Sequence, residues 1–223
     1  MESSKRWMTL IGMKLKTNTQ LKQYKIMRKN FSLIFCFLFL VSIVNFNADA
    51  IEPDVFIQST INKATNALSE DLSKEQKILQ LKQIATDTVD IKGIGFYSLG
   101  KHRKNLSDEK INEYSEVFYD YFMTSFSSRL SEYSNPVIEV NAKEKINENY
   151  TIVSSTLAAT EKRPEIKIDW RVYTKNPDKP LIRDLIIEGL SLARTQKEEF
   201  NSIIQGADGD IEALLTNLKN FKK

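Results

Sequence analysis

Residues 165–204 constrain the fold most, because they join two alternating strands and a helix without interruption. Apolar side chains recur at every second position over 166–172, as they do in half-buried β-strands. Within 181–190, Leu185, Ile187 and Gly189 alternate with Asp184, Ile186 and Glu188. The residues between these two segments, 176–178, are Asn-Pro-Asp and predict a turn. The spacing of apolar residues then becomes helical over 193–205. A hairpin that runs directly into a helix predicts a fold that mixes helices with an antiparallel sheet.

The rest of the chain predicts helices on both sides of a run of strands. Ser73 and Gln76 form a capping-box pattern, Asp90 and Ser107 stand at expected helix N-caps, and Gly100 stands at an expected helix end. This order indicates an α+β fold with one curved, four-stranded antiparallel sheet and helices on one of its faces. We expect helices over 53–68, 73–89, 91–99, 107–133, 193–205 and 211–221, and strands over 136–146, 150–159, 166–175 and 181–190.

The first 50 residues have the features of a secretory leader. Basic residues at 28–29 precede an apolar run, 31–46, whose 16 residues are fewer than the roughly 20 that a transmembrane helix needs. Residues 48–50 are Ala-Asp-Ala, a small-x-small cleavage site. An uncleaved membrane anchor is the alternative interpretation. The expected division is an upstream extension over 1–26, a signal peptide over 27–50 that is cleaved after Ala50, and one domain over 51–223.

Cleavage would reverse the net charge of the chain. The leader holds 8 Lys/Arg and 2 Asp/Glu, so its removal changes the net charge from +3 to −3. Nucleic-acid binding needs a concentrated basic surface, and this balance argues against it. The single cysteine, Cys36, lies in the leader, so we expect no disulfide and no thiol chemistry in the mature domain.

The sequence offers no pattern typical of catalysis. The chain has one histidine, His102, between Lys101 and Arg103 in a predicted loop. Ser191 has no histidine base in any known motif spacing, and no group of His, Cys or carboxylates has the spacing of a metal site. Glycine-rich phosphate loops are also absent from the sequence. We therefore expect a binding protein without catalytic residues, metal or cofactor.

Several segments, in this order and spacing, resemble the MlaC family. The most recognisable is Asp184, Glu188, Gly189 and Ser191, a D-x-x-x-E-G-x-S pattern between a strand and a helix. The family comprises periplasmic phospholipid-binding, toluene-tolerance auxiliary proteins of Mla-type ABC transport systems, which act in outer-membrane lipid asymmetry. One departure is that 102–104 is His-Arg-Lys where the family usually has an aromatic pair and a basic residue. The other segments that carry the resemblance are 89–101, 105–110, 170–172, 196–200 and 209–215.

The resemblance implies a monomeric periplasmic phospholipid carrier. Such a carrier would hold acyl chains in an apolar cavity between sheet and helices. It would move lipid between an inner-membrane ABC transporter complex and an outer-membrane lipoprotein complex of the MlaA type. Glu188, Gly189 and Ser191 are expected to be structural, with contact to the lipid headgroup as the alternative. The basic loop 101–104 is either a solvated turn or a docking surface. The candidate tail contacts are Phe96, Tyr97, Leu99, Phe118, Phe122, Phe126, Val153, Leu157, Ile168, Trp170, Val172, Leu185, Ile187, Leu190 and Leu192.

The apolar face of the predicted sheet leaves other interpretations open. Periodicity alone fits an ordinary filled core beneath the long helix as well as it fits a lipid cavity. The alternatives are a binder of another apolar small molecule, a membrane-anchored envelope scaffold without ligand, and an enzyme on a similar fold. An enzyme would need a polar dyad in the cavity, against which the apolar strand faces argue.

Overall fold

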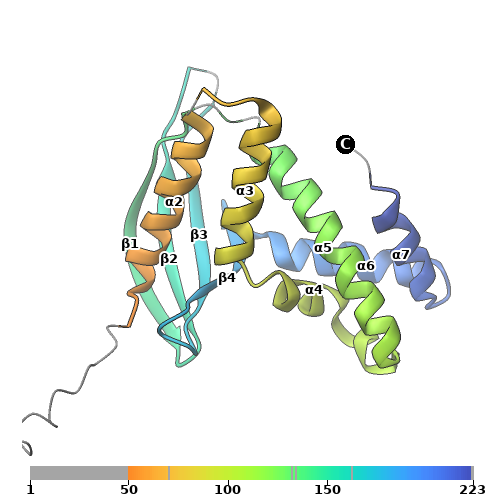
Figure 1. Cartoon of the computed structure of the whole chain (residues 1–223). Helices are drawn as coiled ribbons and strands as arrows, with labels where there is room; N and C mark the ends of the chain where they lie inside the picture. Colours follow the sequence, from red (N-terminus) through yellow and green to blue (C-terminus); the bar gives the residue numbers. More distant parts are fainter. Residues whose placement is uncertain (1–49, 70, 132, 134, 162, 222–223) are drawn as a thin grey trace, which may run out of the picture. The chain divides into compact units, whose positions relative to one another are not determined.

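Helices precede and follow one antiparallel sheet in the computed structural model, which describes residues 50–69, 71–131, 133, 135–161 and 163–221 (Figure 1). The leader predicted over 1–50 lies outside this range except for Ala50, so its processing stays a prediction. The elements are α2 (Pro53–Ser69), α3 (Lys74–Thr88), α4 (Ile91–Leu99), the 3₁₀ helix η1 (Gly100–Asn105), α5 (Asp108–Leu130), β1 (Ile138–Asn147), β2 (Tyr150–Leu157), β3 (Ile166–Tyr173), β4 (Leu181–Ile187), β5 (Leu190–Ser191), α6 (Leu192–Gly206) and α7 (Ile211–Lys219).

The strands form one antiparallel meander in the order β1-β2-β3-β4-β5. The four strands predicted from the sequence are present, and a fifth, β5, was missed. The sequence predicts one continuous strand over 181–190, but Glu188 and Gly189 have φ angles of 49° and 82°. Two successive positive φ angles reverse the chain within a two-residue turn, so Leu190 pairs back onto Ile187. The sheet therefore has five strands, of which the last is two residues long.

One face of the sheet is buried against α2. Burial alternates strictly along β2, where Val153 is fully buried and pairs with Trp170 of β3. Ile57 and Ile61 of α2 pack with Val153, Val172 and Ile182 in the first apolar cluster, the sheet cluster. In Figure 1, α2 runs along the sheet beside β1 and β2, and it contacts both strands. The apolar side chains predicted to share one face of β2 and β3 thus lie on the face that packs against α2.

A second apolar cluster, the helix cluster, is built by α3, α4, α5, α6 and α7. The long helix α5 packs against α3, α4 and α7, which Figure 1 shows to one side of the strands. Phe118 lies at the centre, with its ring centroid 5.7 Å from that of Tyr114 and 6.1 Å from that of Phe200. Gly95 lets α4 and α5 lie close together, because a Cβ at this position would lie 2.7 Å from Phe118 Cδ1.

The predicted helix starts are confirmed. Ser73 accepts a hydrogen bond from the Gln76 amide, and the Gln76 side chain accepts one from the Ser73 amide, completing the capping box. Asp90 caps α4 through the Gly93 amide at 2.9 Å. Ser107 caps α5. Each cap supplies an acceptor to an amide that has no partner inside its helix.

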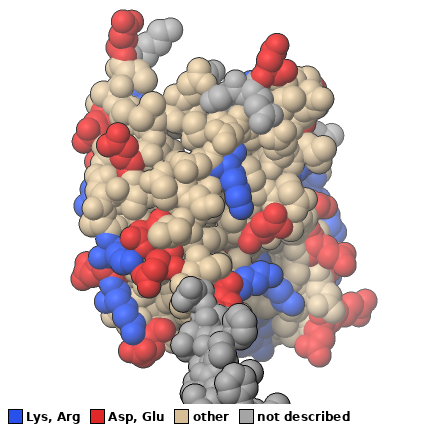
Figure 2. Space-filling model, turned by 60° about the vertical axis from the view of Figure 1, so that its left-hand side comes forward, with Lys and Arg blue, Asp and Glu red and all other residues tan. Residues whose placement is uncertain are grey.

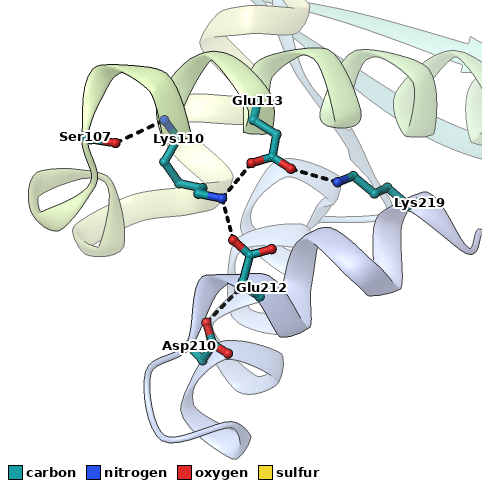
Figure 3. Close-up of polar contacts among 6 residues, drawn as sticks. All are labelled: Ser107, Lys110, Glu113, Asp210, Glu212 and Lys219. Atoms are coloured by element: carbon teal, nitrogen blue, oxygen red, sulfur yellow. Dashed lines mark hydrogen bonds and ion pairs between the residues drawn. The ribbon is translucent and has the colours of Figure 1, made fainter.

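An ion-pair network ties α7 to α5 (Figure 3). Lys110 donates to Glu113 at 2.7 Å and to Glu212 at 2.5 Å. Lys219 donates to the other oxygen of Glu113 at 2.7 Å. Hydrogen bonds from Lys110 and then Lys219 lower the pKa of Glu113 to about 2, and those to Glu113 and Glu212 raise the pKa of Lys110. Leu214, Leu215 and Leu218 attach α7 to the helix cluster by apolar packing, and the ion-pair network adds polar contacts between α7 and α5.

Acid is expected to loosen α7 selectively. The pKa of Glu113 is lower in the fold, about 2, than its ordinary value of 4.5. Its stabilising contribution is therefore complete above about pH 4.5 and is lost as the pH falls through about 2. Hydrogen exchange of the α7 amides should be faster in Glu113→Gln than in the unsubstituted protein at pH 6, and this difference should shrink toward pH 2. A difference that stays constant over this range would contradict the prediction.

Candidate functional site

Of the fifteen apolar residues predicted to contact acyl chains, seven belong to one of the two clusters or pack against it. Leu99 and Phe118 belong to the helix cluster, whereas Val153 and Val172 belong to the sheet cluster. Val89, at the end of α3, packs against both clusters. By burial, the candidates fall into three groups. Leu99, Phe118, Val153, Leu157, Ile168 and Val172 are buried, Phe96, Phe122, Phe126, Trp170, Leu185 and Ile187 are half-buried, and Tyr97, Leu190 and Leu192 are exposed.

The half-buried candidates on the sheet share one face. Trp170 pairs with Val153 on one side and with Leu185 on the other, and Ile168 pairs with Ile187 further along the same face. The Trp170 indole N–H donates to Ser155 Oγ at 2.8 Å. Its polar atom is thus satisfied by the sheet, and the apolar part of the ring keeps some exposed surface. This face can accept apolar groups without leaving an indole N–H unpaired.

A row of phenylalanines runs along α5. Phe118, Phe122 and Phe126 are four residues apart, with ring centroids separated by 6.2 Å and then 5.7 Å. The Phe122 and Phe126 rings are stacked at 11°. Phe118 is only 2% exposed, while the other two rings are half-buried. Phe122 and Phe126 are therefore available to a ligand, and Phe118 is part of the protein core.

A surface hollow of about 420 Å³ lies where α4, η1, β4 and α6 meet. Phe96 and Tyr97 are the two predicted tail contacts that line it. Arg103 and Lys104 belong to the basic loop predicted from the sequence, whereas the positions of Arg183 and Lys197 in the same lining were not predicted. The full lining is Gly93, Phe96, Tyr97, Gly100, Arg103, Lys104, Arg183 and Lys197.

The D-x-x-x-E-G-x-S segment builds the junction between the sheet and α6. The Asp184 carboxylate is buried and accepts hydrogen bonds from Ser191 Oγ at 2.6 Å and from the Ala193 amide at 2.9 Å. Ser191 Oγ also accepts from the Arg194 amide, so it is the N-cap of α6. No atom lies within 4 Å of a Cβ built on Gly189, so its positive φ, and not a close neighbour, accounts for the glycine. Asp184 and Ser191 thus connect β4 to α6, and Gly189 lies in the turn between β4 and β5.

The polar residues singled out for possible chemistry have structural partners. His102 Nε2 lies 3.0 Å from Asn201 Oδ1, which joins η1 to α6. Ser191 Oγ is engaged by Asp184 and the α6 amide. Among the residues that the structure describes, no group of His, Cys, Asp and Glu is arranged to hold a metal ion. Within the same residues, no helix combines the length and apolar character of a membrane span.

Comparisons with known proteins agree with this architecture. Among solved structures, the chain is similar to a phospholipid-binding protein from Ralstonia solanacearum that was solved in complex with a phospholipid. The TM-score is 0.63 and the identity 17%, over 75% of this chain and 94% of that one. At this identity the likeness shows a shared fold. None of the curated proteins matches. The family model described as MlaC protein matches residues 58–220. Because that match spans most of the chain, the protein belongs to the MlaC family.

Proposed function

We propose that this protein is a periplasmic phospholipid carrier and not an enzyme. It would hold acyl chains against the sheet face around Trp170 and the exposed sides of Phe122 and Phe126. The observation that carries this proposal is the family match over residues 58–220. The phospholipid-bound state of the Ralstonia solanacearum protein, which has the same fold, supports it.

The energetics of lipid transfer explain why such a protein needs no catalytic residue. Two acyl chains of about 16 carbons contain roughly 30 methylenes, and exposing them to water costs on the order of 25 kcal/mol at about 0.8 kcal/mol each. A carrier lowers this cost by offering apolar surface throughout the transfer. We propose that it receives and delivers lipid by docking to an inner-membrane Mla-type ABC transporter complex and to an outer-membrane MlaA-type lipoprotein complex.

The proposed location follows from the leader. Basic residues, a short apolar run and Ala48-Asp49-Ala50 fit export and cleavage after Ala50, leaving residues 51–223 in the periplasm. N-terminal sequencing of the protein recovered from cells would show Ile51 first if this proposal is correct. An intact apolar run in the recovered protein would instead favour the anchored scaffold.

Native mass spectrometry of the protein purified from a bacterial periplasm without detergent tests the carrier proposal. Added mass that resolves after extraction into phospholipids would support it. A protein that is free of lipid, and stays free after incubation with phospholipid vesicles, would overturn it. Recovery of a different apolar compound would show that the protein binds another class of ligand.

Replacing Trp170 by aspartate is expected to lower lipid retention about tenfold or more, because a carboxylate beside acyl chains is desolvated without a partner. Retained lipid per protein, measured by native mass spectrometry, is the readout. Leu79→Asp is the matched control, since Leu79 is 69% exposed on α3. Phe122→Asp tests the α5 side in the same way. Unchanged lipid retention in a folded Trp170→Asp protein would show that the binding surface lies elsewhere.

A further inference from the structure

The hollow between α4 and α6 concentrates positive charge without any carboxylate in its lining. Its four charged residues, Arg103, Lys104, Arg183 and Lys197, are all basic. The remaining lining consists of two glycines and two aromatic residues. On the face shown in Figure 2, by contrast, basic and acidic side chains lie interspersed around a broad area with neither. We propose that this hollow binds the phosphate group of a phosphate ester.

Three of the four cations keep their hydrogen-bond donors free for a ligand. Among the described residues, Arg103, Lys104 and Lys197 have no carboxylate within ion-pair distance, whereas Lys110 and Lys143 each contact two. The Arg103 guanidinium lies 4.9 Å from the Phe96 ring centroid, and the Lys197 amine lies 4.9 Å from that of Tyr97. An aromatic face attracts a cation without occupying its N–H groups, so these donors remain available to phosphate oxygens.

The fourth cation, Arg183, forms a fixed wall of the hollow. Its guanidinium pairs with Asp90 at 2.6 Å, donates to the Tyr150 hydroxyl at 2.8 Å, and stacks 3.6 Å from the Tyr173 ring centroid. Asp90 offsets much of its charge, so the anion would be held mainly by the other three cations. A phosphate monoester carries a charge of about −1.5 to −2 at pH 7 and a diester about −1, so three cations without carboxylate partners attract either anion and leave net positive charge in the hollow.

The backbone at the end of α4 is shaped to admit Lys197. Gly100 has a φ angle of 58°, and a Cβ there would lie 3.0 Å from Lys197 Cε. A glycine therefore allows both the turn into η1 and the position of the Lys197 side chain. At about 420 Å³, the hollow lies within the usual range for small-ligand sites and has room for more than a bare phosphate. Phe96 and Tyr97 give the organic part of an ester an apolar wall.

The test is a titration of the periplasm-purified protein at low ionic strength with two probes. One probe is glycerol 3-phosphate, and the other is short-chain phosphatidylglycerol below its micelle concentration. The variant carries Arg103→Gln, Lys104→Gln and Lys197→Gln. The matched control carries Lys63→Gln, Lys74→Gln and Lys82→Gln, which change the charge equally at residues that do not line the hollow. Lys104→Glu, at an exposed side chain, is a second variant with little risk to folding.

We expect the hollow variant, but not the control, to bind at least one probe about tenfold more weakly, and raised salt to weaken the protein's own binding. Loss for the lipid would assign the site to a headgroup, and loss for glycerol 3-phosphate alone would assign it to a soluble ester. Equal affinities of the protein and both hollow variants for both probes would overturn the inference. If the protein retains no lipid but binds glycerol 3-phosphate more tightly than the hollow variant does, the phosphate site would be supported although the carrier proposal had failed.

Discussion

Phe118→Ala is expected to lower the free energy of unfolding by about 3–5 kcal/mol, the largest effect of any single substitution discussed for this chain. The ring is 2% exposed and contacts Tyr114, Tyr121, Phe122 and Phe200. Its removal would leave a cavity between α4, α5 and α6 that neighbouring helices fill only in part. Urea unfolding of the lipid-free protein, followed by circular dichroism, measures the change.

Phe122→Ala is the matched control, because it removes the same side chain one turn further along α5. Phe122 is half-buried, so its removal should cost clearly less. The comparison also separates the two roles that the sequence analysis could not distinguish. A core residue changes stability without ligand, whereas a ligand contact changes lipid retention. Equal losses of stability in the two variants would contradict the assignment of Phe118 to the core.

The local features of the fold could be predicted because they depend on a few neighbouring residues. The caps at Ser73, Asp90 and Ser107 each need one side chain and an amide three residues away, and all three form. The alternation in β2 and β3 likewise follows from each strand alone. The turn at Glu188 and Gly189 was misjudged because positive φ at a glutamate has no strong sequence signal.

The sites depend on residues far apart in the chain, and there the sequence was less informative. Lys197 lines the hollow with Arg103 and Lys104 because α6 packs against α4, and Arg183 joins them because β4 also contacts α4. A register shift opposite Arg171 and Val172 places Arg183 where it can reach Asp90. Periodicity predicts that an apolar residue faces inward, but it does not predict which of two clusters receives it. The proposed tail contacts therefore remain a prediction.

Asp184→Ala is expected to lower the free energy of unfolding by about 2–3 kcal/mol, through the first residue of the family signature. The carboxylate is 4% exposed and joins β4 to α6 through Ser191 Oγ and the Ala193 amide. The first turn of α6 has no acidic residue of its own, so Asp184 supplies from the strand the negative charge that a helix N-terminus favours. Alanine would leave a buried amide without an acceptor.

Two further variants make the role of this carboxylate specific. Asp184→Asn keeps one acceptor oxygen for the Ala193 amide and loses the charge. Its free energy of unfolding should therefore fall between those of the unsubstituted protein and Asp184→Ala. Asp178→Ala removes an exposed carboxylate in the turn before β4 and should change stability by less than about 0.5 kcal/mol. Urea unfolding compares all three. If Asp184→Ala is no more destabilised than Asp178→Ala, the signature aspartate does not hold the strand and helix together. Its place in the family pattern would then have to come from contacts with lipid or partner.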